Sequence, residues 1–463
     1  MGNRFFIVII CLLFSVLSCV EAFAQSEPTV LSLNDAIRLA LEYNRELKSS
    51  QDRIASANIS LETAKSEFTI KIRPEISGLY QQNDELDQNY GLEFSKKFRF
   101  GGEASWRTRT SVDASLEEKY QTDLIFAYTQ PLLRGRGTMP TTNAIVSAER
   151  NTRVQYRSLQ LFQQRLIVQV AASYYGILRD QTLIEVTKQA VERSQLLLQA
   201  AKAKLKVGMA SKMDVFRAEL QQLTAENSLV NALASLENAK RRFNLLLGAG
   251  MDVEYRFSST LEYLPAPLER DELIQQALAN RLEIQNAHER IHDAERQMQI
   301  ARQNLYPPLN VTVQYTLRGQ GDDFGSSWNM EKDFWGVGVR SSFNLDFANE
   351  RAAYQQAHLT LNSALRALQS VKDDIISEVF QTIVSVRQAE ASVKFQEQSV
   401  LQAEKQLELS SLRYKKGLSD NLDVVNAQES LIRAKNGYYS AIVQHIISKM
   451  RLKQVSGTLE VPF

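Results

Sequence analysis

Two stretches of the sequence decide the fold: Leu205-Lys-Val-Gly-Met-Ala-Ser-Lys-Met-Asp-Val215 and Tyr414-Lys-Lys-Gly-Leu-Ser-Asp-Asn-Leu-Asp-Val424. In each, a glycine (Gly208 or Gly417) precedes an aspartate (Asp214 or Asp423) at the same spacing. The flanking runs contain no proline and are rich in Ala, Gln, Glu, Lys and Leu, which are good helix formers. Because glycine readily ends a helix, each stretch predicts a tight turn between two long antiparallel helices.

The similarity of the two stretches extends along the chain and predicts a duplication. Ala218 matches Ala427 and Gly248 matches Gly457 at the offset that relates the two turns. Further upstream, Ala40-Leu41 aligns with Ala277-Leu278 and Arg53-Ile54 with Arg290-Ile291. We therefore expect a first repeat in residues 25–250, a linker or equatorial region in 251–269, and a second repeat in 270–463.

The first 24 residues have the pattern of a secretory signal peptide. Arg4 supplies a positive charge, an apolar run follows from Phe5 to Leu17, and Ala22-Phe23-Ala24 is a small-x-small cleavage site. A lipoprotein signal with Cys19 as the lipid-bearing residue is the alternative. The two cysteines of the chain, Cys11 and Cys19, both lie in this segment, so cleavage after Ala24 would leave a mature chain without disulfides or thiol ligands.

The charge balance argues against nucleic acid as a partner. The chain has 54 Lys and Arg against 53 Asp and Glu, for a formal net charge of +1, and no basic stripe. After the signal there is no apolar stretch of about 18 residues, so the sequence predicts no transmembrane helix.

Each copy is expected to contain the same elements in the same order. The first helix covers about 34–69 and again about 270–305, with apolar residues at helical spacing. Strand-like segments follow at about 72–132 and about 309–345. A very long helix then covers about 142–206 and about 348–414. After tip turns at 206–213 and 415–422, a fourth helix covers about 213–247 and about 423–453.

The strand-like segments alternate between apolar and polar residues. Leu309, Val311, Val313, Tyr315 and Leu317 alternate with polar residues, as do Trp335, Val337, Val339 and Phe343 with polar or small ones. The alternation fits a soluble sheet with one face in a core, and it fits a membrane barrel with one face toward lipid. The first copy has additional segments at 92–98 and 104–112 around Gly101-Gly102, a hairpin signal. This hairpin could join a barrel or lie at its rim.

The helix lengths suggest a tube. At 1.5 Å per residue each long helix spans about 100 Å, and the first and fourth helices of a copy together span about the same length. Two shorter helices could therefore stack end to end beside one long helix. Such helices need neighbours on both sides, which a closed ring of subunits would supply.

Taken together, these motifs closely resemble the TolC-like outer membrane efflux protein family. The residues that carry the resemblance are Ala40-Leu41 with Asn44 and Leu47, the run Gln130-Pro-Leu-Leu-Arg-Gly135, and the two tips, Val207 to Val215 and Arg413 to Val424. The match covers nearly the whole mature chain, in duplicate and in order.

The resemblance implies a mostly α protein with a β-barrel portion. Long antiparallel helical hairpins would form a periplasmic α-barrel, continuous with a transmembrane β-barrel that three subunits share in the outer membrane lipid. The family pattern gives two membrane strands per repeat. A homotrimer of this kind would serve as the exit duct of a tripartite efflux pump or a type I secretion system, and would dock a periplasmic adaptor and an inner membrane transporter of RND or ABC type. The duct itself would have no enzymatic activity and no cofactor.

The resemblance also suggests residues for a pore gate at the periplasmic tip. Asp423 and Asn426 fall where the family often places charged gate residues, and Asp214 and Arg217 are their counterparts in the first repeat. Three carboxylates in a ring would concentrate cations, although Asn426 and Arg217 make this gate less acidic. The alternative is that Asp214 and Asp423 only cap their helices.

The tip turns are the expected docking surface for the adaptor. Gly208 and Gly417 would make the turns, and Val207, Met209 and Leu418 would present apolar side chains, next to Arg413 and Tyr414. Packing within the subunit is the alternative role of these side chains.

Two other functions were considered. His288-Glu289-Arg290-Ile291-His292 matches the H-E-x-x-H signature of zinc peptidases, but Arg290 would put a cation beside the metal, and the same slot of the first repeat, Gln51 to Ala55, has no histidine. A pore-free periplasmic coiled-coil scaffold or adaptor would explain the helices and the signal, but not two sets of alternating segments at matching places.

Overall fold

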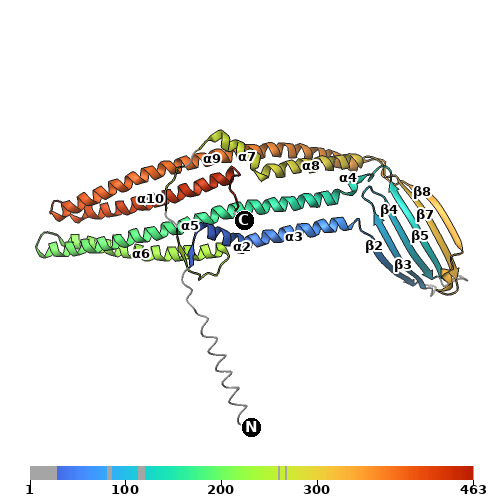
Figure 1. The fold of residues 1–463 in the computed structure, drawn as a ribbon, viewed down its shortest axis with the longest axis horizontal. Helices are drawn as coiled ribbons and strands as arrows, with labels where there is room; N and C mark the ends of the chain where they lie inside the picture. The colour runs from blue at the N-terminus through green and yellow to red at the C-terminus, as the bar shows by residue number, and fades with distance from the viewer. Residues whose placement is uncertain (1–28, 81–85, 113–119, 259–260, 266–267, 462–463) are drawn as a thin grey trace, which may run out of the picture.

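The structure, a computed structural model, describes residues 29–80, 86–112, 120–258, 261–265 and 268–461. The chain is elongated, with long paired helices over most of its length and a β-sheet at one end (Figure 1). The expected signal peptide, the Cys19 lipidation site and the cleavage site at Ala24 lie outside the described residues.

The elements occur in an order close to the expected one. The first half contains β1 (Thr29–Leu31), α2 (Leu33–Tyr43), α3 (Arg45–Ser66), β2 (Lys71–Tyr80), β3 (Leu86–Lys97), β4 (Glu103–Val112), β5 (Tyr120–Pro131), α4 (Thr138–Thr141), α5 (Asn143–Lys206) and α6 (Lys212–Leu247). The second half contains β6 (Tyr255–Phe257), α7 (Arg270–Asn280), α8 (Leu282–Gln303), β7 (Asn310–Gly321), a 3₁₀ turn (Ser326–Trp328), β8 (Lys332–Arg340), α9 (Ala348–Lys415) and α10 (Asn421–Val455).

The prediction of one continuous first helix in each half was wrong. Helix α2 ends before Asn44, whose backbone is extended (ψ 129°) and whose side chain accepts hydrogen bonds from the N–H groups of Glu46 and Leu47 to begin α3. Arg281 breaks α7 from α8 with a similarly extended backbone (ψ 124°) but without a side-chain cap, and its guanidinium is held by Glu283 at 2.7 Å and Glu378 at 3.0 Å. The apolar residues keep their helical spacing on both sides of each break. Periodicity alone therefore does not reveal where the first helix ends and the second begins.

The end-to-end stacking of two shorter helices beside a long one is present. Where α6 ends, the Asn44 side chain donates a hydrogen bond to the Leu246 carbonyl at 2.8 Å. Gly248 there adopts φ 77°, and a Cβ on it would lie only 2.2 Å from the Tyr43 carbonyl oxygen. Helices α3 and α6 therefore form one line along α5, which with its 64 residues spans about 100 Å.

A small sheet and the main hydrophobic core lie at the middle of the helical region. β1 pairs in parallel with β6. Next to it, Tyr174 and Phe243 are fully buried, and the Tyr174 hydroxyl donates a hydrogen bond to the Leu31 carbonyl at 3.0 Å. This core fixes α2, α5 and α6 to one another around the junction of the stacked helices.

The strands form one antiparallel sheet of six, in the order β2-β3-β4-β5-β7-β8. The strands agree closely with the segments expected from alternation. The additional hairpin, β3 and β4, lies inside the sheet between β2 and β5, so it is part of the sheet and does not lie at its rim. Within the described part of the chain, no helix is long and apolar enough to cross a membrane.

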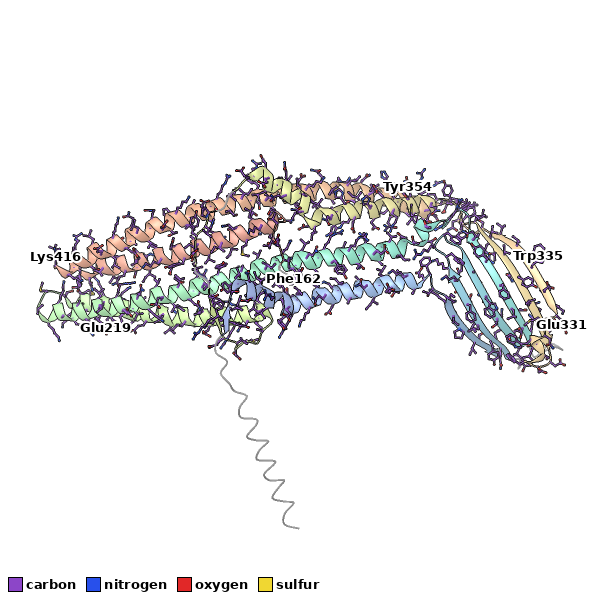
Figure 2. All side chains as sticks on the ribbon, in the orientation of Figure 1. Phe162, Glu219, Glu331, Trp335, Tyr354 and Lys416 are labelled. Carbon is purple, nitrogen blue, oxygen red and sulfur yellow. The ribbon has the colours of Figure 1, made fainter. Side chains whose placement is uncertain are left out.

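The two faces of this sheet differ in polarity. One face carries apolar and aromatic side chains, many of them well exposed: Ile76 and Trp335 are each 78% accessible and Val339 is 67% accessible (Figure 2). The opposite face carries most of the charged residues, among them Glu93 with ion pairs to Arg73 and Arg107. Figure 1 shows the sheet extending beyond the long helices. The 3₁₀ turn packs on one end of the sheet, where Ser327 is buried and hydrogen-bonds with Thr122 at 2.8 Å.

Candidate gate at the helical tips

Both tip turns are closed by the same backbone motif. After α5, Gly208 adopts φ 73°, and the N–H groups of Gly208 and Met209 donate hydrogen bonds to the carbonyls of Leu205 (3.1 Å) and Lys204 (2.8 Å). After α9, Gly417 also has φ 73°, and the N–H groups of Gly417 and Leu418 donate to the carbonyls of Tyr414 (3.1 Å) and Arg413 (2.9 Å). This pairing is the Schellman motif, which requires a left-handed residue where the glycine stands.

The residues that cap the fourth helices are not those expected. Ser211 is the N-cap of α6, and Asp214 is its partner in a capping box, with the Asp214 carboxylate accepting from the Ser211 N–H at 2.9 Å. Asp420 is the N-cap of α10 and accepts from the Leu422 N–H at 3.2 Å. The alternative that Asp214 and Asp423 are themselves the N-caps was therefore wrong, because each lies three residues inside its cap.

Asp423 and Asn426 have exposed side chains on the first two turns of α10. In the described part of the chain, the Asp423 carboxylate has neither a hydrogen bond nor an ion pair. Its counterpart Asp214 is engaged in the cap. The two halves of the chain therefore use the matching aspartates differently, and of the two only Asp423 leaves a carboxylate available to the surroundings.

Three polar contacts join the first tip to the second. The Lys204 ammonium hydrogen-bonds to the Tyr414 carbonyl oxygen and lies 4.0 Å from the centroid of the Tyr414 ring. The Arg217 guanidinium lies 3.4 Å from the Asp420 carboxylate and 4.0 Å from that of Asp214. The third contact is the hydrogen bond from the Asn421 side chain to the Asp214 carbonyl, at 2.6 Å. We refer to these three contacts as the tip clasp.

An apolar cluster lies under the tip clasp. Tyr414 is only 6% accessible and packs with residues of both helical hairpins: Leu197, Leu198, Ala201, Ala218 and Val424. Burial, together with the negative charge of Asp214, raises the pKa of the Tyr414 phenol above its ordinary value, so the ring stays neutral. Its hydroxyl oxygen is buried without a hydrogen-bond partner among the described residues.

The expected docking residues form an exposed rim around the two turns. Val207 is 69% accessible, Met209 65% and Leu418 68%, and Arg413 is exposed as well. The turns lie side by side, since a Cβ on Gly417 would be 3.8 Å from the Met209 methyl carbon. Packing within the subunit therefore leaves these three side chains largely uncovered. Figure 2 labels Lys416, next to Gly417, at the end of the molecule opposite the sheet.

Four residues of the tip clasp and caps were missed from the sequence: Lys204, Ser211, Asp420 and Asn421. The spacing of Ser211 and Asp214 is the S-x-x-[DE] signature of a capping box and could have identified the cap. No local pattern identifies Lys204 or Asn421, because their partners lie about 200 residues away, in the other half of the chain.

The H-E-x-x-H match has a structural role instead. One carboxylate oxygen of Glu289 accepts from Arg153 at 3.0 Å and from Arg157 at 2.7 Å, which ties α8 to α5. His288 and His292 are exposed on the helix surface. No group of three or more His, Cys, Asp or Glu suited to hold a metal ion occurs among the residues that the structure describes. The geometry argues against a zinc peptidase.

Comparisons with known proteins agree with this architecture. The model of the family described as outer membrane efflux protein matches the chain twice, over residues 36–249 and 273–458. The outer membrane protein TolC of Vibrio cholerae is 24% identical over 68% of the chain and 72% of its own length. The solvent efflux pump outer membrane protein SrpC of Pseudomonas putida is 23% identical over 93% of the chain and 85% of its own length. Among solved structures, the outer membrane protein VceC of Vibrio cholerae superposes with a TM-score of 0.71 at 17% identity, over 92% of the chain and 96% of that protein.

Proposed function

Because the chain belongs to the outer membrane efflux protein family, we propose that three copies form the exit duct of a tripartite efflux pump or a type I secretion system. The chain is an outer membrane protein with a long periplasmic portion. In the proposed duct, cargo passes from a periplasmic adaptor and an inner membrane transporter to the outside. The duct is passive, and the transporter supplies the energy.

The observation that carries this proposal is the sheet with one exposed apolar face, continuous with helices of about 100 Å. An exposed apolar face of this size in water would promote aggregation, whereas in a bilayer it faces lipid. The opposite, charged face then lines a lumen, as in outer membrane barrels. Closing the sheets of three copies into one barrel would also pair the free strand edges, which cannot stay unpaired in lipid.

In this proposal the tip clasp is the gate. Lys204, Arg217 and Asn421 hold the two hairpins of a subunit against each other at the narrow periplasmic end. Separating the hairpins breaks these contacts and widens the tip. The Asp423 carboxylates of three copies, which no cap engages, then face the passage and attract cations, with the nearby Arg217 side chains as partial compensation.

The exposed rim of Val207, Met209 and Leu418 is the proposed docking surface for the adaptor. Apolar side chains that stay about two-thirds accessible at the end of a long hairpin suit contact with another protein. Docking there would act directly on the tip clasp, because Met209 and Leu418 follow the two turns that the clasp connects.

The pore-free periplasmic scaffold is disfavoured by the sheet. A scaffold would bury its strands within a soluble domain, yet most of the apolar face of this sheet is exposed, from Ile76 of β2 to Trp335 of β8.

Labelling of intact cells tests the proposal through two exposed residues at opposite ends of the molecule, Glu331 beyond the sheet and Lys416 at the tips (Figure 2). A thiol reagent that cannot cross the outer membrane should modify a Glu331→Cys variant and leave a Lys416→Cys variant unmodified until the membrane is permeabilised. Equal protection of both cysteines would instead place the whole chain in the periplasm and support the scaffold.

A further inference from the structure

The hairpin formed by β3 and β4 changes the size of the barrel that three copies can build. The family pattern predicts two strands per repeat, whereas the sheet has six strands, four of them from the first half of the chain. We infer that β2 of one copy pairs with β8 of the next, so that three six-stranded sheets close a barrel of eighteen strands, not twelve. This inference rests on the proposed trimer and specifies its membrane portion.

The first support is that the apolar face runs without interruption across the additional hairpin. The rings of Phe94 (β3) and Trp106 (β4) stack with centroids 4.9 Å apart, and Trp106 stacks on Phe126 (β5) at 5.9 Å. In the strand register Phe94 lies opposite Ile72 of β2, and Phe126 lies opposite Tyr315 of β7. A hairpin at the rim would not share one apolar surface with the strands on both sides. All six strands therefore present this surface to lipid.

The second support is that the charged face also runs through the hairpin. Glu93 of β3 pairs with Arg73 of β2 at 3.5 Å and with Arg107 of β4 at 2.8 Å. A second row of charges lies on the same face, two residues further along β4. There Arg109 lies opposite Asp123 of β5, and Asp123 forms an ion pair with Arg318 of β7 at 2.7 Å. In both rows, charged residues of β3 or β4 lie next to charged residues of the neighbouring strands. The hairpin is therefore a continuous part of the lumen wall.

The third support is the direction of the two edge strands. Neighbouring strands of this sheet are all antiparallel, and their number is even, so β2 and β8 run in opposite directions. When β2 of one copy lies beside β8 of the next, the two strands form another antiparallel pair. The closed ring is then antiparallel throughout. A single six-stranded sheet closed on itself would leave no aqueous channel, because even eight strands leave an interior just wide enough for side chains.

The lengths of the strands suit a membrane wall. They range from nine residues in β8 to twelve in β3, β5 and β7, against the roughly 9–11 residues that a tilted strand needs to cross a bilayer. Barrels of 16–18 strands leave an aqueous channel.

The membrane end of the duct would then be wide, and the helical tips would be its narrowest point. Cargo too bulky for a barrel of about twelve strands could leave through it.

Disulfide formation between strands tests the inference. Ser77 of β2 is combined with Gly336 or Gly338 of β8, each changed to cysteine in the full chain. The two glycines suit this purpose because a Cβ on either has no atom within 4 Å. The control pair joins Ser77 to Gln121 of β5, which lies in the same cross-strand row three strands away and is therefore about 14 Å distant, beyond the reach of a disulfide. Single-cysteine variants account for any reaction of the two native cysteines.

With eighteen strands, oxidation should join copies into covalent dimers and trimers in at least one Ser77 and β8 pair, and the Ser77 and Gln121 pair should stay unlinked. An intramolecular link between Ser77 and Gln121 would mean that β2 pairs with β5 and that the hairpin lies outside the barrel, which overturns the inference.

Electron cryo-microscopy of the unmodified protein in lipid discs gives an independent count if a variant fails to insert. Eighteen strands around a three-fold axis would support the inference, and twelve would overturn it while leaving the proposed duct intact. A protein that does not enter the discs and forms no ring would instead overturn the proposed function, on which the inference rests.

Discussion

The Lys204 ammonium of α5 lies 4.0 Å from the centroid of the Tyr414 ring of α9, although about 200 residues separate the two in the sequence. The contact joins the end of one long helix to the end of the other, just before the two tip turns. Because the ring is buried and neutral, its face can attract the cation without competition from water. The two tips are thereby coupled within one chain.

Removing the Tyr414 ring should loosen both tips. Tyr414→Ala deletes the cation–π contact, worth about 0.5–2 kcal/mol, and a ring packed in the apolar cluster under the clasp. Backbone amides of both tip turns should exchange with deuterium several-fold faster, measured by mass spectrometry. Tyr414→Phe is the control, because it keeps the ring and removes a hydroxyl that has no hydrogen-bond partner among the described residues. Equal exchange in the alanine variant and the native protein would mean that the ring does not hold the tips.

The ion pair between Arg217 and Asp420 should make a smaller, salt-dependent contribution. Both side chains are about half exposed, so a double-mutant cycle with Arg217→Gln and Asp420→Asn should give a coupling of about 0.2–1 kcal/mol in the closed-to-open equilibrium. Asparagine still caps α10, which separates loss of the pair from loss of the cap. The coupling should vanish near 1 M salt, where screening is strong. A coupling that is unchanged by salt would show that the contact is not electrostatic.

Asp214 and Asp423 should respond differently to the same substitution. Asp214→Ala removes one half of a capping box and should lower the stability of α6 by about 0.5–2 kcal/mol, whereas Asp214→Glu should be nearly neutral because it retains the box. Asp423→Ala should leave stability unchanged and reduce the preference of the pore for cations, measured as a reversal potential in a salt gradient. A stability loss of the same size in both alanine variants would contradict the different roles assigned here.

Glu289 should add an acid-sensitive contribution to the stability of the helical wall. Its partial burial acts to raise the pKa of the carboxyl, but hydrogen bonds from Arg157 and Arg153 outweigh this and lower the pKa below its ordinary value. Since the folded-state pKa is depressed, the stabilisation is present above the ordinary carboxyl pKa and is lost as pH falls through the lower folded-state value. Thermal unfolding between pH 6 and pH 3 should therefore depend less on pH in Glu289→Gln than in the native protein. Added zinc should change the melting temperature of neither, whereas a zinc-dependent rise would revive the peptidase hypothesis.

Much of the fold follows from local signals. Gly208 and Gly417 predicted the tips, and alternation predicted the strands to within a few residues, because turn glycines and strand periodicity reflect constraints that act over a few residues. The breaks at Asn44 and Arg281 were missed because the apolar face of the helix continues across them. The position of the hairpin between β2 and β5 could not be predicted, because alternation does not specify which strands become neighbours.

The candidate site was predicted less completely than the fold. Asp214, Arg217 and the rim residues were identified from their place in the repeats. Lys204 and Asn421 were not, because their partners come together only when the two hairpins pack side by side. In the proposed trimer, what Asp423 faces depends on contacts between copies, which no pattern within one chain specifies.

Single-channel recording in a planar lipid bilayer tests the central claim most directly. The purified protein would be compared with a variant in which two of the three contacts of the tip clasp are removed, Lys204→Met with Tyr414→Ala and Arg217→Gln. The account predicts discrete, long-lived currents for the native protein and larger or more frequently open currents for the variant, because the tip is the narrow, gated end of a conducting duct. Identical currents from both would place the gate elsewhere, and the absence of current from both correctly folded proteins would contradict the duct itself.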